Sequence, residues 1–317
     1  MDTKHLRSVN LRREARDMAE LEKIDSILNS LLTSLSQERT RLTPESRLEE
    51  LECETCHQKF TAQVHIYRFG ARERKVYPHE CPECKQKREE RERLEAEEEN
   101  RLRLIALREK WRLSCGIPQW MINKTFDNFE ANLQKVAYRE ALNYAEGLNL
   151  EEVIGYPSLI FYSQENGVGK THLAIAIVNK TIDNWNGDTD RPACPVRFES
   201  GPGLIRRIRA TYNIGIGAYH EREEDVYNQL RGVKLLILDD VGKERPSEHT
   251  REVYFYIIDE RYKAGLPVVI TSNLPLESQP SLSDLMGVST VDRLIGMTRG
   301  KIIELKGKSY RQLRKQP

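Results

Sequence analysis

The sequence predicts an α/β fold in which helices cover both faces of a parallel sheet. Short, continuous apolar runs alternate with helix-like segments from residue 158 onward, as is typical of strands that are buried on both faces. A glycine-rich loop joins the first of these runs to the helix-like segment after it. Two paired cysteine motifs and a charged stretch come earlier in the chain, so we also expect a smaller N-terminal module.

Composition limits the class of protein. The 317 residues are 38% hydrophobic and 31% charged, and the formal net charge is +1. No apolar stretch reaches the roughly 20 residues of a membrane span, and residues 1–13 lack the apolar segment of a signal peptide. We therefore expect a soluble, cytoplasmic protein with no membrane partner, in a compartment where thiols stay reduced.

The first 48 residues are expected to form a helical N-terminal region. A helix over residues 5–35 would carry apolar residues, spaced three and four apart, on one face. These residues are Leu21, Ile24, Leu28, Leu31 and Leu35. Such a helix could pack in a small bundle or dock on a partner protein. Residues 36–48 are polar and predict a connector.

Two C-x-x-C pairs predict a metal-binding module over residues 49–84. The four cysteines are Cys53, Cys56, Cys81 and Cys84. Four thiolates can complete a tetrahedral zinc site and leave no open position, so we expect a structural zinc. Strands over residues 60–67 and 74–77 would form a zinc-ribbon-like sheet between the pairs. His57 or His79 could replace one cysteine, and thiols without metal are the alternative.

A charge-dense segment follows over residues 85–114. Acidic and basic residues recur four positions apart, which favours a solvated helix that links two modules. Nucleic-acid binding through this helix is less favoured, because its positive and negative charges nearly cancel.

The globular domain is expected over residues 115–317, after a boundary at Gly116 and Pro118. Strands are expected over residues 158–162, 196–199, 235–238, 267–270 and 301–305. Helices are expected over residues 132–148, 173–178, 204–212, 221–230, 248–263 and 291–297. This alternation is the reason for predicting a parallel sheet.

The glycine-rich loop over residues 163–172 predicts a phosphate-binding site. It matches G-x-x-x-x-G-K-[ST], except that Gln164 stands where the first glycine is expected. Backbone N–H groups would surround a polyphosphate at a helix N-terminus, Lys170 would reach its β- and γ-phosphates, and the Thr171 hydroxyl would bind Mg²⁺. The residues expected to contact the nucleotide here are Asn166, Gly167, Val168, Gly169, Lys170, Thr171 and His172.

Polar side chains follow two further apolar strands. Asp239 and Asp240 end one of them, and Asn273 follows the next. Ligands of open α/β sheets bind at the carboxyl ends of strands, so Asp239 should join Thr171 at the Mg²⁺. Asp240 would orient or deprotonate the attacking water, and Asn273 would hold that water against the terminal phosphate.

These motifs, in this order, resemble the DnaC/DnaI/IstB group of AAA+ ATPases. The matching stretches are residues 167–174, 236–242, 258–262, 271–273, 292–294 and 307–311, together with Pro267. The resemblance covers residues 115–311. It implies an AAA+ P-loop fold, ATP as the nucleotide, and subunits that associate through their ATPase domains.

The resemblance also implies roles for single residues. Lys170 and Thr171 resemble the Walker A pair, Asp239 and Asp240 resemble the Walker B pair, and Asn273 resembles sensor 1. Arg293 matches the arginine finger, which completes the nucleotide site of a neighbouring subunit. Arg311 matches the sensor 2 arginine, beside the nucleotide. Catalytic roles are thus expected for Lys170, Asp240, Asn273 and Arg293.

Two features bear on DNA binding and on rate. Arg206, Arg207 and Arg209 crowd one short helix, in a region that carries single-stranded DNA contacts in AAA+ initiators and loaders. An ordinary solvated helix is the alternative. Asp240 stands where AAA+ proteins commonly have Glu, and its shorter side chain should hold the water less well. We therefore expect slow hydrolysis, suited to a switch.

The hypothesis that these features favour is an ATP-dependent replicative helicase loader acting in DNA replication initiation. Its N-terminal region would bind a ring helicase, and its AAA+ domains would hold single-stranded DNA. One alternative is an IstB-type transposition ATPase, which coats DNA and recruits a transposase. Another is a non-catalytic, ATP-binding zinc adaptor.

Overall fold

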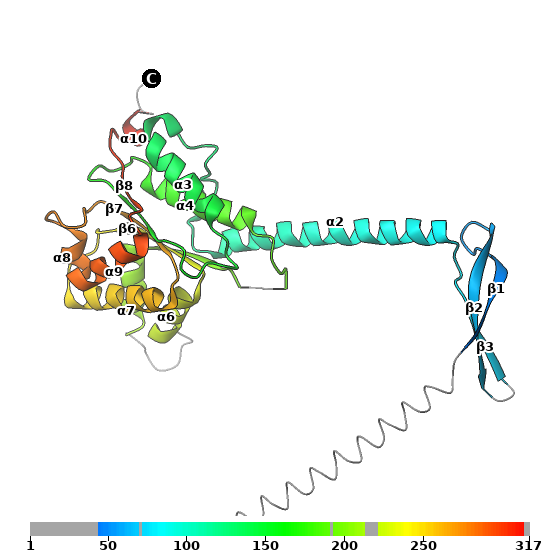
Figure 1. Ribbon diagram of the computed structural model, residues 1–317. Coiled ribbons are helices and arrows are strands. Elements are labelled where there is room, and N and C mark those ends of the chain that lie inside the picture. The colour runs from blue at the N-terminus through cyan, green and yellow to red at the C-terminus, as the bar shows by residue number, and fades with distance from the viewer. Residues whose placement is uncertain (1–43, 70–71, 191–192, 213–220, 314–317) are drawn as a thin grey trace, which may run out of the picture. The chain divides into compact units, whose positions relative to one another are not determined.

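The computed structural model describes residues 44–69, 72–190, 193–212 and 221–313. The chain divides into two compact units, with the boundary between Glu97 and Glu98, and Figure 1 labels most elements of both. The helix expected over residues 5–35 lies outside the described residues.

A small antiparallel sheet forms the first unit. Its strands are β1 (Glu45–Glu52), β2 (Lys59–Phe69) and β3 (Arg72–Val76), in the order β1-β2-β3. Val64 and Ile66 alternate along β2 with more exposed residues and are buried, as in a sheet with one covered face. The strands predicted over residues 60–67 and 74–77 are confirmed.

The connector expected over residues 36–48 is wrong from Glu45 onward, because β1 begins there. β1 pairs with β2 along its whole length, from Glu45 opposite Ile66 to Glu52 opposite Lys59. Its sequence, ESRLEELE, lacks the alternation that marks a strand. The strand therefore depends on pairing with β2, which a local pattern does not reveal.

The helix α2 (Pro82–Ser114) confirms the helix predicted over residues 85–114. Its last turns differ from the solvated linker that was expected. Trp111 is 1% exposed and packs edge-on against Trp185, with ring centroids 4.6 Å apart. Arg108 donates from Nε to the Trp185 carbonyl at 3.1 Å. The end of the predicted linker is therefore part of the core of the second unit.

A parallel sheet of five strands lies at the centre of the second unit, in the order β5-β6-β7-β4-β8. The strands are β4 (Leu159–Tyr162), β5 (Val196–Ser200), β6 (Leu235–Val241), β7 (Val268–Ser272) and β8 (Ile302–Glu304). All five correspond to predicted strands. The adjacent strands β6, β7 and β4 carry the motifs that were expected to meet.

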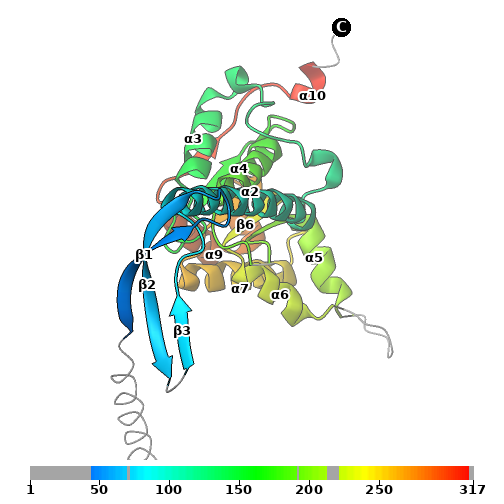
Figure 2. The same cartoon turned by 90° about the vertical axis from the view of Figure 1, so that its right-hand side faces the viewer.

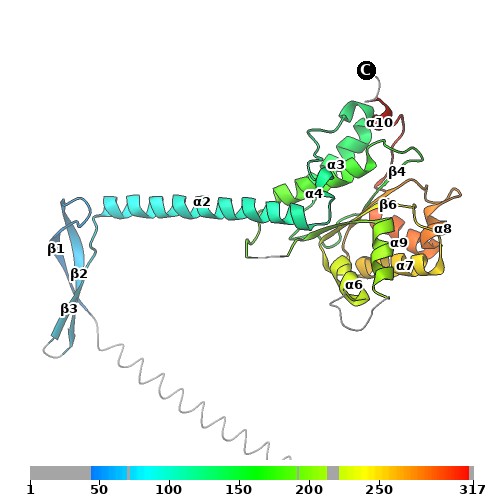
Figure 3. The same ribbon diagram turned by 180° about the vertical axis from the view of Figure 1, so that it is seen from behind.

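Helices cover both faces of this sheet, as predicted. Leu235 and Ile237 of β6 belong to a core shared with α3, α4 and the end of α2. Leu236 and Leu238 belong to a second core, with α5, α6, α7, α8 and α9. Figures 2 and 3 show α3 and α4 on one side of β6, and α6 and α7 on the other.

The six predicted helices of this unit are present in the predicted order, and two short helices, Leu282–Met286 and Tyr310–Leu313, were not predicted. The helices are α3 (Lys135–Gly147), α4 (Lys170–Asn184), α5 (Gly201–Ala210), α6 (Glu223–Gly232), α7 (Glu248–Ala264), α8 (Leu282–Met286), α9 (Val288–Thr298) and α10 (Tyr310–Leu313). Single 3₁₀ turns occur at Gln119–Met121 and Ala131–Leu133. Across the described ranges, no helix is long and apolar enough to span a membrane.

Candidate nucleotide site and metal centre

The phosphate loop joins the end of β4 to the first turn of α4. Gly167 and Gly169 have φ angles of 77° and 104°, a region that residues with a Cβ rarely occupy. A Cβ on Gly169 would also lie 2.7 Å from the Phe129 ring. Because α4 begins at Lys170, its unpaired N–H groups and the positive end of its dipole lie at the loop. This arrangement suits a phosphate ligand.

Gln164 keeps an ordinary backbone conformation at the position where the motif has glycine. The described non-glycine residues with positive φ are His57, Asp240 and Arg299. The loop therefore obtains its shape from Gly167 and Gly169, and its first position accepts a side chain.

Lys170 is held by the backbone of the loop. Its Nζ donates to the carbonyl oxygens of Ser163, at 3.3 Å, and Glu165, at 3.0 Å. Burial lowers the pKa of Lys170 to about 8, while the nearby carboxylates of Asp240 and Asp239 act in the opposite direction. A phosphate in the loop would add a further negative charge and would keep the ammonium protonated.

Thr171 and Asp239 are in contact, as predicted. The Thr171 hydroxyl donates to Asp239 Oδ2 at 3.1 Å, and the Thr271 hydroxyl donates to Oδ1 at 2.6 Å. Burial raises the pKa of Asp239 to about 6, although both hydroxyls oppose the rise. A carboxylate and a hydroxyl beside a phosphate loop are the oxygen donors that Mg²⁺ prefers. A divalent cation would also relieve the buried negative charge, so these residues fit Mg²⁺.

Asp240 lies near the end of β6, where the pairing with β7 shifts register, and has a left-handed φ of 54°. Its N–H donates to the Thr271 hydroxyl at 2.9 Å, so one threonine holds both Asp239 and Asp240. The Asp240 side chain is 34% exposed, and its Oδ2 lies 2.7 Å from Lys243 Nζ. The candidate base is therefore fixed at its backbone and paired at its carboxylate.

One pocket of about 550 Å³ brings most of the predicted nucleotide residues together. Asn273 lies within it and donates from Nδ2 to Asn166 Oδ1 at 2.7 Å. The predicted residues that line the pocket are Asn166, Gly167, Val168, Gly169, Lys170, Thr171, His172, Asp240 and Asn273. Asp239 is buried and is not among the residues that line the pocket, but it contacts the pocket residue Thr171.

Sequence reasoning missed the walls of this pocket. Trp120, Phe129, Lys243 and Tyr310 line it. The Tyr310 N–H donates to the Gly167 carbonyl at 3.0 Å, and the Phe129 and Tyr310 rings lie 6.0 Å apart. In the sequence, Tyr310 was indicated only by the match of residues 307–311 to the DnaC/DnaI/IstB group. No motif pointed to Trp120 or Phe129.

Arg293 lies on α9, away from the pocket of its own chain. Its Nε is 3.0 Å from Asp259 Oδ1, and its guanidinium lies 5.0 Å from the centroid of the Phe255 ring. A residue that completes a neighbouring subunit's site would lie outside its own. Arg311 falls in α10, next to the pocket residue Tyr310, and its side chain is outside the described part of the structure.

The three arginines of α5 have different surroundings. Arg206 and Arg209 are exposed. Arg207 donates from Nη1 to Glu199 Oε1 at 2.6 Å and from Nε to Glu221 Oε2 at 2.8 Å. Two carboxylates already neutralise Arg207, so Arg206 and Arg209 are better placed to meet phosphates than Arg207.

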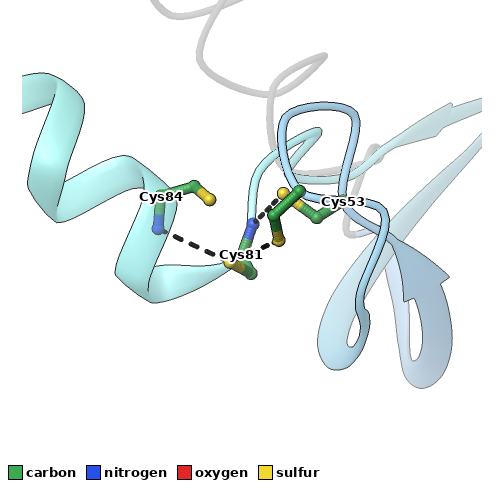
Figure 4. A group of neighbouring side chains, drawn as sticks. Cys53, Cys81 and Cys84 are labelled. Atoms are coloured by element: carbon green, nitrogen blue, oxygen red, sulfur yellow. Dashed lines mark hydrogen bonds between the residues drawn. The ribbon is translucent and has the colours of Figure 1, made fainter.

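The four cysteines of the first unit form one cluster. The sulfur atoms of Cys53, Cys56, Cys81 and Cys84 all lie within 4.8 Å of one another. The Cys56 and Cys81 sulfurs are 3.8 Å apart, and tetrahedral zinc with Zn–S bonds of about 2.3 Å requires about this spacing. Figure 4 shows three of these residues where the strand loop meets the start of α2. The donor set and its spacing fit zinc.

Backbone contacts favour a thiolate at Cys53, whereas the neighbouring Cys81 sulfur raises the pKa of Cys84 to about 12. The Cys81 N–H donates to Cys53 Sγ at 3.2 Å and lowers the pKa of Cys53 to about 6. Cys81 precedes α2, so its sulfur lies near the positive end of that helix. The two candidate replacements are engaged elsewhere: His57 bonds Glu52 at 3.2 Å and His79 bonds Glu54 at 2.7 Å. Four cysteines therefore remain as the ligand set.

Comparison with protein families gives one match that spans more than half of the chain. The model of IstB-like ATP-binding proteins matches residues 103–317. This chain belongs to the IstB-like family. Membership confirms the predicted resemblance to the DnaC/IstB group of AAA+ ATPases. It also implies a bound nucleotide and, in general terms, ATPase activity.

Curated proteins similar to this IstB-like chain include replication proteins. The replicative helicase loader DnaC of Buchnera aphidicola (subsp. Acyrthosiphon pisum, strain APS) is 25% identical over 181 residues, 56% of this chain and 66% of that protein. DnaC of Escherichia coli K12 is 26% identical over 182 residues, again 66% of its length. The chain thus spans slightly less than two thirds of these DnaC proteins. The chromosomal replication initiator DnaA of Levilactobacillus brevis (strain ATCC 367) is 32% identical over 162 residues, which are 32% of DnaA.

Solved structures similar to the IstB-like chain include two of this group. A crystal structure of the DnaC helicase loader has a TM-score of 0.48 and 24% identity, covering 60% of this chain and 100% of that one. A crystal structure of DnaI has a TM-score of 0.44 and 20% identity, covering 61% and 93%. TM-scores and sequence identities this low do not support a conclusion about function.

Proposed function

We propose that this IstB-like protein is an ATP-dependent replicative helicase loader that acts in DNA replication initiation. The supporting observation is the single pocket in which Lys170, Asp240 and Asn273 meet beside the phosphate loop. It occurs in a chain whose relatives include proteins named replicative helicase loaders. A loader of this kind would act in the cytoplasm.

The pocket supports ATP hydrolysis with a defined role for each residue. Lys170 would bind the β- and γ-phosphates, and Thr171 with Asp239 would hold Mg²⁺, which neutralises phosphate charge when bound. Asn273 would orient a water molecule. As the water oxygen bonds the terminal phosphorus, the bond to the ADP oxygen breaks, and Asp240 would accept the proton of the water.

Hydrolysis should be slow, because Asp240 is shorter than the usual Glu and should hold the attacking water less well. Turnover should be measured for the wild type, Asp240→Glu and Asp240→Asn. We expect Asp240→Glu to be faster than the wild type and Asp240→Asn to be inactive. Fast wild-type turnover that is lost in Asp240→Asn would contradict the slow switch. Nucleotide binding without any turnover would favour the non-catalytic adaptor.

The first unit is proposed to bind the ring helicase through its zinc module. Pull-down of the bacterial or phage helicase by the full chain, compared with a chain that starts at Glu98, tests this. A truncation after residue 112 would be a poor choice, because it removes the buried Trp111. The truncated chain must still bind nucleotide, which shows that its ATPase unit has folded.

We expect the full chain to retain the helicase and the truncated chain to lose it. Retention by both chains would assign helicase binding to the ATPase unit. Retention of a transposase alone would overturn the loader function.

Single-stranded DNA is proposed to bind along α5, through the exposed Arg206 and Arg209. Removing two phosphate contacts should reduce the slope of log affinity against log salt by about 1.4. The test is fluorescence anisotropy of an oligonucleotide with the Arg206→Ala/Arg209→Ala variant. Arg139→Ala, an exposed arginine on α3, serves as the control. An unchanged slope would remove α5 from the DNA site.

Nucleotide sites are proposed to be shared between subunits through Arg293. Lys170→Ala and Arg293→Ala should each be inactive alone. In a mixture, the first can supply an intact Arg293 to the second, so part of the ATPase activity should return. No recovery on mixing, while each variant still associates with itself, would contradict a role for Arg293 in a neighbour's site.

An IstB-type transposition ATPase is the second candidate. It is supported by the family model itself, which describes IstB-like proteins. Its distinguishing outcome is binding of a transposase, with long DNA coated in the presence of ATP and no binding of a ring helicase.

A further inference from the structure

Lys243 is a pocket residue to which the proposed hydrolysis assigns no task. It lines the same pocket as Lys170 and Thr171. Its Nζ lies 2.7 Å from Asp240 Oδ2, with side chains that are 47% and 34% exposed. The carboxylate that would accept the proton of the water is therefore bonded to an ammonium group.

Hydrogen bonds hold the backbone of the segment that carries this pair. The Gly242 N–H donates to Glu244 Oε2 at 2.7 Å, and the Tyr254 hydroxyl donates to Glu244 Oε1 at 2.6 Å. Asp240 is bonded through its own N–H to Thr271. The backbone is thus held on both sides of Lys243, and the freedom that remains lies in the long lysine side chain.

A nucleoside triphosphate would change the balance of charge at this pair. With its β-phosphate in the loop beside Lys170, its terminal phosphate extends toward the side chains of Asp240 and Asn273, which line the same pocket. That phosphate carries more negative charge than one carboxylate and competes for the ammonium of Lys243. A diphosphate ends at the loop and presents no such group.

We propose that Lys243 recognises the terminal phosphate of a nucleoside triphosphate. In this structure Lys243 holds Asp240. When a triphosphate binds, the ammonium transfers to the terminal phosphate and leaves the carboxylate available to the attacking water. Lys243 is then a second phosphate-binding lysine that separates triphosphate from diphosphate. The inference rests on the proposed function, because it requires a nucleotide in this pocket.

Equilibrium binding by the full chain tests this directly. Dissociation constants for ADP and for the non-hydrolysable triphosphate AMPPNP are measured with Mg²⁺ by calorimetry. Lys243→Ala should weaken AMPPNP binding by about tenfold, the value of one charge-assisted hydrogen bond, and should change ADP binding by less than about twofold. Lys263→Ala is the matched control. Its Nζ is also 2.7 Å from an aspartate, Asp259 Oδ2, and it does not line the pocket.

A double-mutant cycle tests the competition between the carboxylate and the phosphate. Asp240→Asn should release Lys243 and tighten AMPPNP binding, and this gain should disappear in Asp240→Asn/Lys243→Ala. Additive effects of the two substitutions on AMPPNP affinity would overturn the role of Lys243, and so would an equal loss of ADP and AMPPNP affinity in Lys243→Ala. Neither result would contradict the nucleotide site itself. A wild type that binds neither nucleotide would overturn the proposed function as well. Thermal unfolding of each variant verifies that it is folded.

Discussion

The buried Asp239 carboxylate should lower the stability of the nucleotide-free protein at neutral pH. The residue is 5% exposed, and burial raises its pKa from the ordinary 3.8 to about 6. A carboxyl with a raised pKa in the folded state binds more protons folded than unfolded, so the free energy of unfolding falls as pH rises from about 4 to above 6. The full change corresponds to about 3 kcal/mol.

Asp239→Asn keeps the shape of the side chain and removes this charge. Between about pH 5 and about pH 7.5, the unfolding free energy of the variant should rise relative to the wild type by about 1.4 kcal/mol, since half of the effect is already present at the lower pH. At about pH 7.5 the variant should be more stable than the wild type by about 2 kcal/mol. This is the full effect of about 3 kcal/mol less about 1 kcal/mol for the loss of one hydrogen bond to a threonine. The same variant should lose Mg²⁺-dependent nucleotide binding.

Urea unfolding in EDTA, followed by tryptophan fluorescence, measures these differences. All three tryptophans, Trp111, Trp120 and Trp185, lie in the second unit, so the signal reports on the unit that contains Asp239. Asp127→Asn, an exposed carboxylate of the same unit, is the control and should follow the wild type at each pH. A stability difference between Asp239→Asn and the wild type that does not change with pH would refute the reasoning.

Three further predictions concern other groups. Burial lowers the pKa of Lys170 to about 8, and phosphate binds the protonated form. Triphosphate affinity should therefore fall by up to about tenfold per pH unit above about pH 8, measured by titration from about pH 7 to pH 9.5. An affinity that is constant over this range would contradict the prediction. Arg261→Met should reduce the unfolding free energy by about 3–5 kcal/mol, because the buried guanidinium donates to four backbone carbonyls. Arg251→Met, an exposed arginine on the same helix, should change it little in the same urea assay. Purified protein should contain one zinc per chain by mass spectrometry. Cys84→Ser should lower that zinc content and speed amide hydrogen exchange in β1–β3, while nucleotide binding persists. A full zinc content in the variant would exclude Cys84 as a ligand.

The parts of the site that could be predicted are those fixed by strand ends. Parallel strands that are adjacent in the sheet bring their carboxyl ends to one edge, so polar residues after apolar runs must meet there. This is why the contact between Thr171 and Asp239, at 3.1 Å, could be expected from two motifs far apart in the sequence. The cysteine pairs were equally informative, because four thiolates suit one tetrahedral ion.

The parts that could not be predicted depend on partners with no local pattern. A run of arginines on α5 suggests a DNA site, but only the fold shows that Glu199 and Glu221 neutralise Arg207. Trp111 lies in a charged sequence, and only its packing against Trp185 shows that the core begins there. The bond between Lys243 and Asp240 likewise has no local sequence pattern, and it occurs where Asp240 has a left-handed backbone conformation near the end of β6.

The contact between Tyr310 and Gly167 has a consequence for the order in which the protein is made. The phosphate loop leaves the ribosome early, but the pocket is completed by a tyrosine that is synthesised more than a hundred residues later. Gln134 is joined to the same late segment through the Lys306 carbonyl, at 2.7 Å. A nascent chain that has not reached Tyr310 therefore lacks one wall of its nucleotide site. Nucleotide capture should begin only after Tyr310 has been synthesised.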